Sequence, residues 1–396
     1  MLQSLGSLAM ATALASSLLL GAPSARDTCE GVVKTPNAFA ALAFALFDGG
    51  DVWAGNGGGL WRTNDGGAHW HDITPSNLVG DDAAVRLAGF GWFGSEDLWF
   101  SATEAGDVTK QGLRGFAIER SNDRGQVWHW TALPSCSACA MSFSFVDAAH
   151  GFAFGSKATL YSTANSGASW VVVSVQLPNS EVPAIDFVDA NFGWLSAGHL
   201  LERTTDAGRT WQHVVLPGGS AAPVALSAPH FFSAANGVVA ATLPGGKGVL
   251  YATDDGGSRW RAEPLPAAPN PPSPAPGWFT EPALEVNSPT IWAMTSGRRL
   301  YVTGDAGQHW AEVPAPPTYG KGDPIWGFAM ASTTSGWLAA AATPCGKTPQ
   351  DLCAVPVLLR TTDQGKNWRM VPSNPGASPV GFSAGEVRCC QPSRCR

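Results

Sequence analysis

Hydrophobic and polar residues alternate along short stretches of this chain, and turn-forming residues separate the stretches. Met141, Phe143 and Phe145 occupy every second position of one stretch, and Leu284 and Val286 do the same in another. A period of two residues is typical of a β-strand with one buried face. The chain is therefore predicted to consist of many short strands, with almost no helix.

A pattern of eight residues occurs seven times. It reads Ser or Thr, any residue, Asp, any residue, Gly, two further residues and Trp. Its third position is filled by Asp65, Asp123, Asn165, Asp206, Asp255, Asp305 and Asp363. Its last position is filled by Trp70, Trp128, Trp170, Trp211, Trp260, Trp310 and Trp368, at intervals of 41 to 58 residues. This recurrence indicates seven copies of one structural unit.

The residue types of the pattern predict a tight β-hairpin turn. An Asp carboxylate accepts hydrogen bonds from backbone N–H groups of its own loop, and Gly adopts backbone angles that other residues resist. We expect the Trp ring to fold back over the turn and cover its backbone. An enzyme needs a catalytic carboxylate once or twice, so a position repeated seven times is predicted to be structural.

A second spacing, in which a polar residue stands four positions before a Gly, precedes the first in several copies. Its members are Asp147 with Gly151, Asp189 with Gly193, Ser233 with Gly237 and Ser332 with Gly336. Each copy then predicts four antiparallel strands, with this turn between the first two and the Asp-containing turn between the last two. Such units are typical of propeller blades. The prediction is one all-β domain over residues 26–373, a seven-bladed β-propeller.

The Asp-containing turn resembles the Asp-box, or bacterial neuraminidase repeat, of the sialidase-like propeller superfamily. The longer unit, such as FVDANFGWLSAGHLLERTTDAGRTW at residues 187–211, resembles the blades of the photosystem II stability/assembly factor family. The resemblance covers about residues 38–372. It implies a non-catalytic assembly factor that binds a protein partner. The repeats define the fold and not the client.

The start of the chain predicts export. Residues 8–22 are apolar, and the small residues Ala22, Ser24 and Ala25 follow before the first charge at Arg26. This is typical of a signal peptide, which we assign to residues 1–25; a buried N-terminal strand or helix is the alternative. No later run of 18 apolar residues occurs, so we expect no transmembrane segment after cleavage, in a secreted or periplasmic protein.

Charge narrows the choice of partner. The chain has 24 Lys and Arg against 31 Asp and Glu, a formal net charge of −7. This balance argues against nucleic acid, because nucleic-acid binding relies on clustered basic residues. We expect a monomer that binds a protein or a glycan, with no cofactor and no metal ion.

The eight cysteines suit an oxidising compartment. They are Cys29, Cys136, Cys139, Cys345, Cys353, Cys389, Cys390 and Cys395. All eight are disulfide candidates, and we expect Cys29 to pair with one of the three in the C-terminal tail, residues 374–396. A zinc site is the alternative, but it needs two ligand pairs and the chain has one CxxC, Cys136 with Cys139.

Connections on the face opposite the repeated turns vary in length. From the Gly of the second spacing to the Asp of the first there are 13 residues in the fourth copy and 27 in the seventh. Loops on a rigid scaffold commonly carry binding. The predicted partner contacts are Lys110, Arg114, Trp278 and Tyr319; the alternative is that the aromatic pair packs its own loops and the basic pair is solvated.

A glycoside hydrolase of sialidase type, or an extracellular carbohydrate-binding propeller, is the alternative function. Sialidase chemistry uses an Arg triad and a Tyr nucleophile. Tyr161, Tyr251 and Tyr301 occupy equivalent repeat positions, which leaves Tyr319 alone. Arginines that precede the pattern also recur, at Arg62, Arg120, Arg203 and Arg360. We therefore predict no catalytic residue.

Overall fold

The structure is a computed structural model, and the described part of the chain consists almost entirely of short β-strands. The described residues are 43–46, 50–56, 59–76, 84–105, 117–133, 141–155, 159–173, 183–217, 223–244, 247–264, 284–296, 299–314, 325–342 and 355–371. They form 29 strands, and no α-helix occurs among them. Within this part of the chain there is accordingly no helix that could cross a membrane.

The strands form seven antiparallel sheets, which we call blades 1 to 7 in chain order. Blade 1 contains β1 (Ala43–Leu46), β2 (Val52–Asn56), β3 (Gly59–Thr63) and β4 (His71–Asp72). Blade 2 contains β5 (Ala84–Phe93), β6 (Asp97–Ala105), β7 (Ala117–Ser121) and β8 (His129–Ala132). Blade 3 contains β9 (Met141–Phe145), β10 (Gly151–Gly155), β11 (Thr159–Thr163) and β12 (Val171–Val173).

The second half of the chain continues in the same way. Blade 4 contains β13 (Ala184–Phe187), β14 (Gly193–Ala197), β15 (Leu200–Thr204) and β16 (Gln212–His213). Blade 5 contains β17 (Ala225–Leu226), β18 (His230–Phe231), β19 (Gly237–Leu243), β20 (Lys247–Thr253) and β21 (Arg261–Pro264). Blade 6 contains β22 (Leu284–Val286), β23 (Trp292–Ser296), β24 (Arg299–Thr303) and β25 (Ala311–Val313). Blade 7 contains β26 (Ile325–Met330), β27 (Gly336–Ala342), β28 (Val355–Thr361) and β29 (Arg369–Met370).

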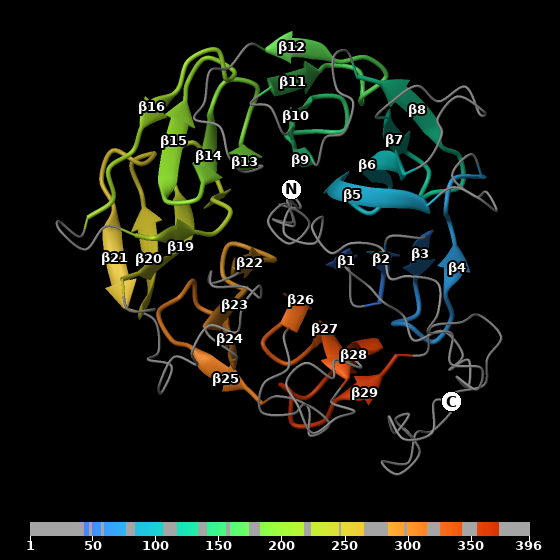
Figure 1. Cartoon of the computed structure of the whole chain (residues 1–396). Helices are drawn as coiled ribbons and strands as arrows, with labels where there is room; N and C mark the ends of the chain where they lie inside the picture. Colours follow the sequence, from blue (N-terminus) through green and yellow to red (C-terminus); the bar gives the residue numbers. More distant parts are fainter. Residues whose placement is uncertain are drawn as a thin grey trace, which may run out of the picture.

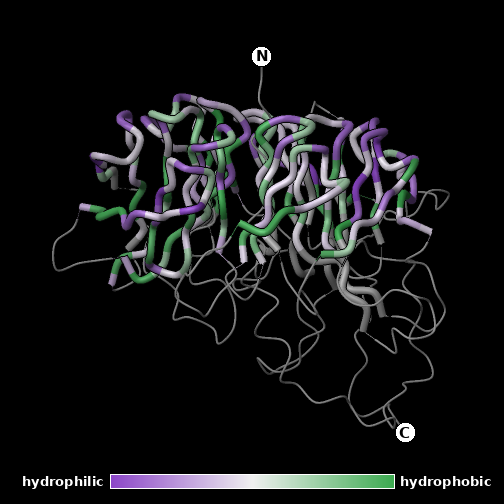
Figure 2. Tube along the Cα trace, turned by 90° about the horizontal axis from the view of Figure 1, so that it is seen from above, coloured by the Kyte–Doolittle hydropathy of each residue, from purple (hydrophilic) through white to green (hydrophobic). Residues whose placement is uncertain are grey.

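The seven blades stand around a common centre, with the first strand of each blade innermost and the last at the rim (Figure 1). Turned by 90°, the described blades lie side by side in a single layer (Figure 2). The predicted seven-bladed propeller is confirmed, with one correction. Blade 5 has five strands, because its innermost strand is divided into β17 and β18, which both pair with β19. Pro229 lies between the two pieces, and proline cannot donate to a strand ladder.

Stacked aromatic rings join blades 2 to 5. An aromatic side chain on the second strand of one blade lies flat against a Phe on the innermost strand of the next. The stacked pairs are Trp99–Phe145 at 3.5 Å, Phe152–Phe187 at 3.6 Å and Trp194–Phe231 at 3.3 Å between ring centroids. Because each pair joins neighbouring blades, the hydrophobic core lies between the sheets.

The Gly of the second sequence spacing has a packing role. Gly193 pairs across the sheet with Phe187 on the innermost strand. A Cβ atom on Gly193 would come within 2.5 Å of the Phe187 ring. Gly151 has the same relation to Phe145, and Gly237 to Phe231. Absence of a side chain therefore makes room for the ring that stacks on the preceding blade.

Blades 1 and 7 close the ring through side chains. Every blade is built from consecutive strands of the described chain, so no strand is exchanged between the two ends. Trp70 of blade 1 meets Trp337 of blade 7 edge to face, with centroids 6.2 Å apart. Arg360 Nη1 of blade 7 donates to the carbonyl oxygen of Gly66 in blade 1 at 2.9 Å.

Candidate functional site

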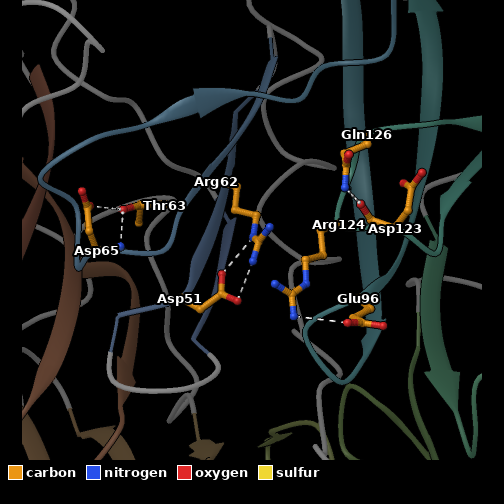
Figure 3. Close-up of polar contacts among 8 residues, drawn as sticks. All are labelled: Asp51, Arg62, Thr63, Asp65, Glu96, Asp123, Arg124 and Gln126. Carbon is orange, nitrogen blue, oxygen red and sulfur yellow. Dashed lines mark hydrogen bonds and ion pairs between the residues drawn. The ribbon is translucent and has the colours of Figure 1, made fainter.

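The repeated turn joins the third and fourth strands of every blade and has one hydrogen-bond pattern. In blade 1 the Thr63 hydroxyl donates to Asp65 Oδ1 at 2.8 Å (Figure 3). The same hydroxyl accepts from the Gly67 N–H at 2.9 Å. Asp65 Oδ1 also accepts from the His69 N–H at 2.9 Å. The same three bonds recur in the other six copies.

Two successive residues in each turn have positive φ. In blade 1 these are Gly66 at 74° and Gly67 at 89°, and in blade 4 they are Ala207 at 63° and Gly208 at 79°. Two left-handed residues in succession are the geometry of a type I′ hairpin turn. The second of them is Gly in all seven copies, since only Gly adopts this conformation without strain.

Hydrogen bonds hold the turn carboxylates in the ionised form. Burial raises the pKa of Asp65, but hydrogen bonds from the His69 backbone and side chain outweigh it and lower the pKa to about 2. In the Asp305 turn, hydrogen bonds from the His309 backbone and side chain lower the pKa to about 2. A carboxylate with so low a pKa is a poor proton donor near neutral pH. Each of these groups is used within its own turn.

Trp and Arg face each other across the second and third strands in four blades. The pairs are Trp53–Arg62, Trp99–Arg120, Trp194–Arg203 and Trp337–Arg360. The guanidinium carbon of Arg62 lies 5.8 Å from the Trp53 ring centroid, and that of Arg360 lies 5.6 Å from Trp337. These distances suit a cation–π contact. Each Arg stands one residue before the repeated turn, so all four lie at the turn face of the ring.

The four arginines differ in their polar partners. Arg62 Nε and Nη2 donate to the two carboxylate oxygens of Asp51 at 2.9 and 2.8 Å (Figure 3). Arg360 donates to Gly66, as described above. The Nε atoms of Arg120, Arg203 and Arg360 are buried and have no hydrogen-bond partner among the described residues. Arg360 still donates through Nη1 to Gly66, so Arg120 and Arg203 retain the most donor capacity for a carboxylate or carbonyl oxygen.

Blade 2 differs from blade 1 in the acidic residue near the Arg. Asp51 directly precedes Val52, which pairs with Thr63 in blade 1. Asp97 holds the same position in blade 2, since it directly precedes Leu98, which pairs with Ser121. Burial, with the charge of neighbouring Glu96, raises the pKa of Asp97 to about 6. Arg124 binds Glu96 instead, at 3.2 Å (Figure 3). Arg120 Nε thus has no acidic partner among the described residues, whereas Arg62 Nε has Asp51.

A row of polar side chains follows the innermost strands of blades 3 to 6, at one equivalent register position. Ser144 Oγ accepts the Phe187 N–H at 2.8 Å, and Asp186 Oδ2 accepts the Phe231 N–H at 2.6 Å. His230 Nε2 lies 3.0 Å from the Leu284 carbonyl oxygen, to which it can only donate. Each of these side chains satisfies a backbone group on the innermost strand of the next blade.

Burial shifts the pKa values of the ionisable side chains in this inner row, to which Glu285 belongs in blade 6. Burial raises the pKa of Asp186 to about 7 despite the hydrogen bond from the Phe231 N–H, and it raises the pKa of Glu285 to about 8. It lowers the pKa of His230 to about 4, so that the imidazole is neutral. Among the described residues Glu285 has no hydrogen-bond or ion-pair partner. No group of three or more His, Cys, Asp or Glu side chains in the described chain is arranged to hold a metal ion.

The partner contacts predicted from the sequence lie outside the described residues. These are Lys110, Arg114, Trp278 and Tyr319, and the same holds for all eight cysteines, the predicted signal peptide and the C-terminal tail. They stay predictions. The repeated Asp, Asn and Trp residues are all described, and the structure brings them together in the turns. The sequence did not reveal the inner row, although Asp186 and Glu285 stand in otherwise apolar strands.

Comparison with known proteins agrees with the class that the fold defines, a β-propeller with a repeated Asp-containing turn. Residues 120–268 match the family described as "Photosynthesis system II assembly factor YCF48". A stretch of 144 residues is 32% identical to the photosystem II assembly lipoprotein Ycf48 of Synechococcus sp. (strain CC9902), and it spans 35% of this chain and 41% of that relative. Both matches lie within part of the chain, and over that part they agree with the family resemblance predicted from the sequence.

One solved structure supports the fold with a TM-score above 0.5. The extracellular domain of BT4673 from B. thetaiotaomicron superposes with a TM-score of 0.51 at 13% identity, over 76% of this chain and 37% of that one. The structure titled "YCF48 bound to D1 peptide" gives a TM-score of 0.49 at 16% identity, over 74% of this chain and 84% of that one.

Proposed function

We propose that this protein is a non-catalytic scaffold that acts outside the cytoplasm and binds a protein partner during assembly of a larger complex. The observation that carries the proposal is the match of residues 120–268 to an assembly-factor family. The relative with 32% identity is described as an assembly lipoprotein. The apolar segment at residues 8–22 supports export across a membrane.

The partner-binding surface that we propose is the face opposite the repeated turns. On the turn face, the seven acidic or amide side chains are committed to hydrogen bonds within their own turns. The connections that differ in length between blades all belong to the opposite face. Lys110, Arg114, Trp278 and Tyr319 belong to these connections, and we propose that they contact the partner.

Arg120 and Arg203 define a competing surface on the turn face. Their buried Nε atoms have no partner among the described residues, and each Arg pairs with a Trp across the sheet. Arginine beside an aromatic ring suits a carboxylate of a bound protein segment. A test of the proposal therefore has to separate the two faces.

The test is quantitative co-purification of the tagged, exported protein from its own cells, by mass spectrometry against an untagged control. The variant Trp278→Ala/Tyr319→Ala changes the loop face, and Arg120→Gln/Arg203→Gln changes the turn face. We expect the loop-face variant to lower recovery of the main partner by about 30-fold, the effect of losing roughly 2 kcal/mol at an aromatic anchor. Full recovery with the loop-face variant and loss with the turn-face variant would move the site to the turn face.

The carbohydrate alternatives are tested separately. Turnover of fluorogenic sialosides or glucans by the purified protein would make it a glycoside hydrolase of sialidase type. Binding on a glycan array without turnover would make it a carbohydrate-binding propeller. The scaffold proposal predicts neither result.

A further inference from the structure

The outermost strand of each blade has an edge that faces away from its sheet. Unpaired edge strands can add a strand from another chain, and proteins commonly protect them with charged residues or proline. Six of the seven outermost strands here carry an ionisable residue. These residues are Asp72 on β4, His129 on β8, His213 on β16, Arg261 on β21, Glu312 on β25 and Arg369 on β29.

The outermost strand of blade 3 lacks this protection. β12 consists of Val171, Val172 and Val173, with neither an ionisable residue nor proline. Val171 is 66% exposed and Val172 is 48% exposed. Among the described strands β12 pairs with β11 alone, and it lies at the rim of the ring (Figure 1). Valine strongly favours the extended strand conformation, so this edge is suited to pairing.

Exposed apolar side chains gather in the same part of the ring. Among the described residues, the large exposed ones are Val127, Trp130, Val171, Val172, Val215 and Val224. All six belong to blades 2 to 5 or to the segments next to their strands, with β12 near the middle of this part of the ring. The described parts of blades 6, 7 and 1 contribute none.

We propose that β12 pairs with β12 of a second copy of this chain, antiparallel and about a two-fold axis at Val172. In this arrangement Val172 meets the same residue of the other copy, and Val171 meets Val173. An isologous contact places each residue near the axis opposite itself, so it tolerates no charge there. Glu312 at the centre of β25 would meet a second carboxylate in the equivalent pairing. The uncharged sequence of β12 fits a second copy, in place of the monomer expected from the sequence.

Sedimentation equilibrium of the exported protein tests this pairing. We expect a weak dimer with Kd on the order of 100 µM, because so short a contact buries less area than a standard interface. Val172→Lys should weaken the dimer at least tenfold, since like charges directly opposite destabilise a strand pair. Val215→Lys is the matched control, an exposed valine on blade 4, and it should dimerise like the unchanged protein.

A charge-swap experiment tests the two-fold axis itself. Val172→Glu alone should be monomeric, and an equimolar mixture of the Val172→Lys and Val172→Glu chains should recover association, because Lys then faces Glu. Circular dichroism confirms that each variant is folded. An unchanged protein that stays monomeric at millimolar concentration would overturn the proposal, and so would a mixture that does not associate.

Discussion

The junction between blades 4 and 5 and the junction between blades 7 and 1 are built differently. At the first, Trp194 stacks on Phe231 with 3.3 Å between centroids, and Asp186 accepts the Phe231 N–H. At the second, Trp70 and Trp337 meet edge to face at 6.2 Å. Blades 4 and 5 are joined by flat stacking and by a side-chain bond to the innermost strand of the next blade, whereas blades 7 and 1 are joined at the turn face.

The reason for the difference lies at one register position. Asp186 pairs with Trp194 across blade 4, and Ala329 pairs with Trp337 across blade 7. The alanine side chain cannot accept a hydrogen bond, so no backbone N–H of the innermost strand of blade 1 is bonded by a side chain at this position. Arg360, which donates to Gly66, supplies the polar contact of the closing junction instead. The same Trp position thus serves both junctions with different polar partners.

The largest expected effect comes from removing a stacked ring between blades 4 and 5. Trp194→Ala should lower the free energy of unfolding by roughly 3–5 kcal/mol, because it removes a fully buried aromatic side chain and leaves a cavity. Urea unfolding measures the loss. Trp130→Ala is the control, since Trp130 is 54% exposed, and its effect should stay within about 0.5 kcal/mol. Equal effects for both variants would contradict the stacking account.

Gly66→Ala should weaken the closing junction, with a loss of roughly 1–2 kcal/mol. A Cβ atom on Gly66 would collide with the Arg360 guanidinium and displace it from the Gly66 carbonyl oxygen, whereas the φ of +74° adds little, because Ala207 and Ala306 adopt positive φ at the equivalent position. Gly94→Ala separates the two causes, because Gly94 has a φ of +64° but no atom within 4 Å of an added Cβ. We expect the Gly94 variant to lose about half as much or less. If the two variants unfold at the same urea concentration, the contact with Arg360 does not close the ring.

Asp186→Ala should cost about 1–3 kcal/mol, because the buried Phe231 N–H loses its acceptor. Asp186→Asn keeps an acceptor oxygen at the same place and should unfold close to the unchanged protein at pH 5. Hydrogen exchange of the Phe231 amide gives a second reading, and it should accelerate only in the Ala variant. A protected Phe231 amide in Asp186→Ala would show that the bond does not hold this junction.

A further effect appears in the pH dependence of stability. Burial raises the pKa of Glu285 to about 8, above its unfolded value, so the folded state retains a proton that the unfolded state loses. The stability from Glu285 is complete below about pH 4 and is lost as pH rises through about 8. Thermal midpoints should therefore fall less between pH 5 and pH 9 in Glu285→Gln than in the unchanged protein. Identical slopes would mean that Glu285 is solvated.

The sequence predicted what is local and repeated, and missed what joins one blade to the next. The turn was predictable because Thr63, Asp65 and Gly67 act on one another within five residues. The bonds of Ser144, Asp186 and His230 were not, because each bonding partner lies on the following blade, 45 residues away for Asp186 and Phe231. The division of the innermost strand of blade 5 depends on Pro229, which the seven-fold pattern does not contain.

We propose that the turn face is structural and that the partner binds the opposite face. Hydrogen–deuterium exchange of the protein with and without its co-purified partner tests this most directly. We expect binding to slow exchange in the peptides around Lys110, Trp278 and Tyr319 and to leave exchange in the seven Asp-containing turns unchanged. Slower exchange in the turns next to Arg120 and Arg203, with none in those peptides, would contradict it.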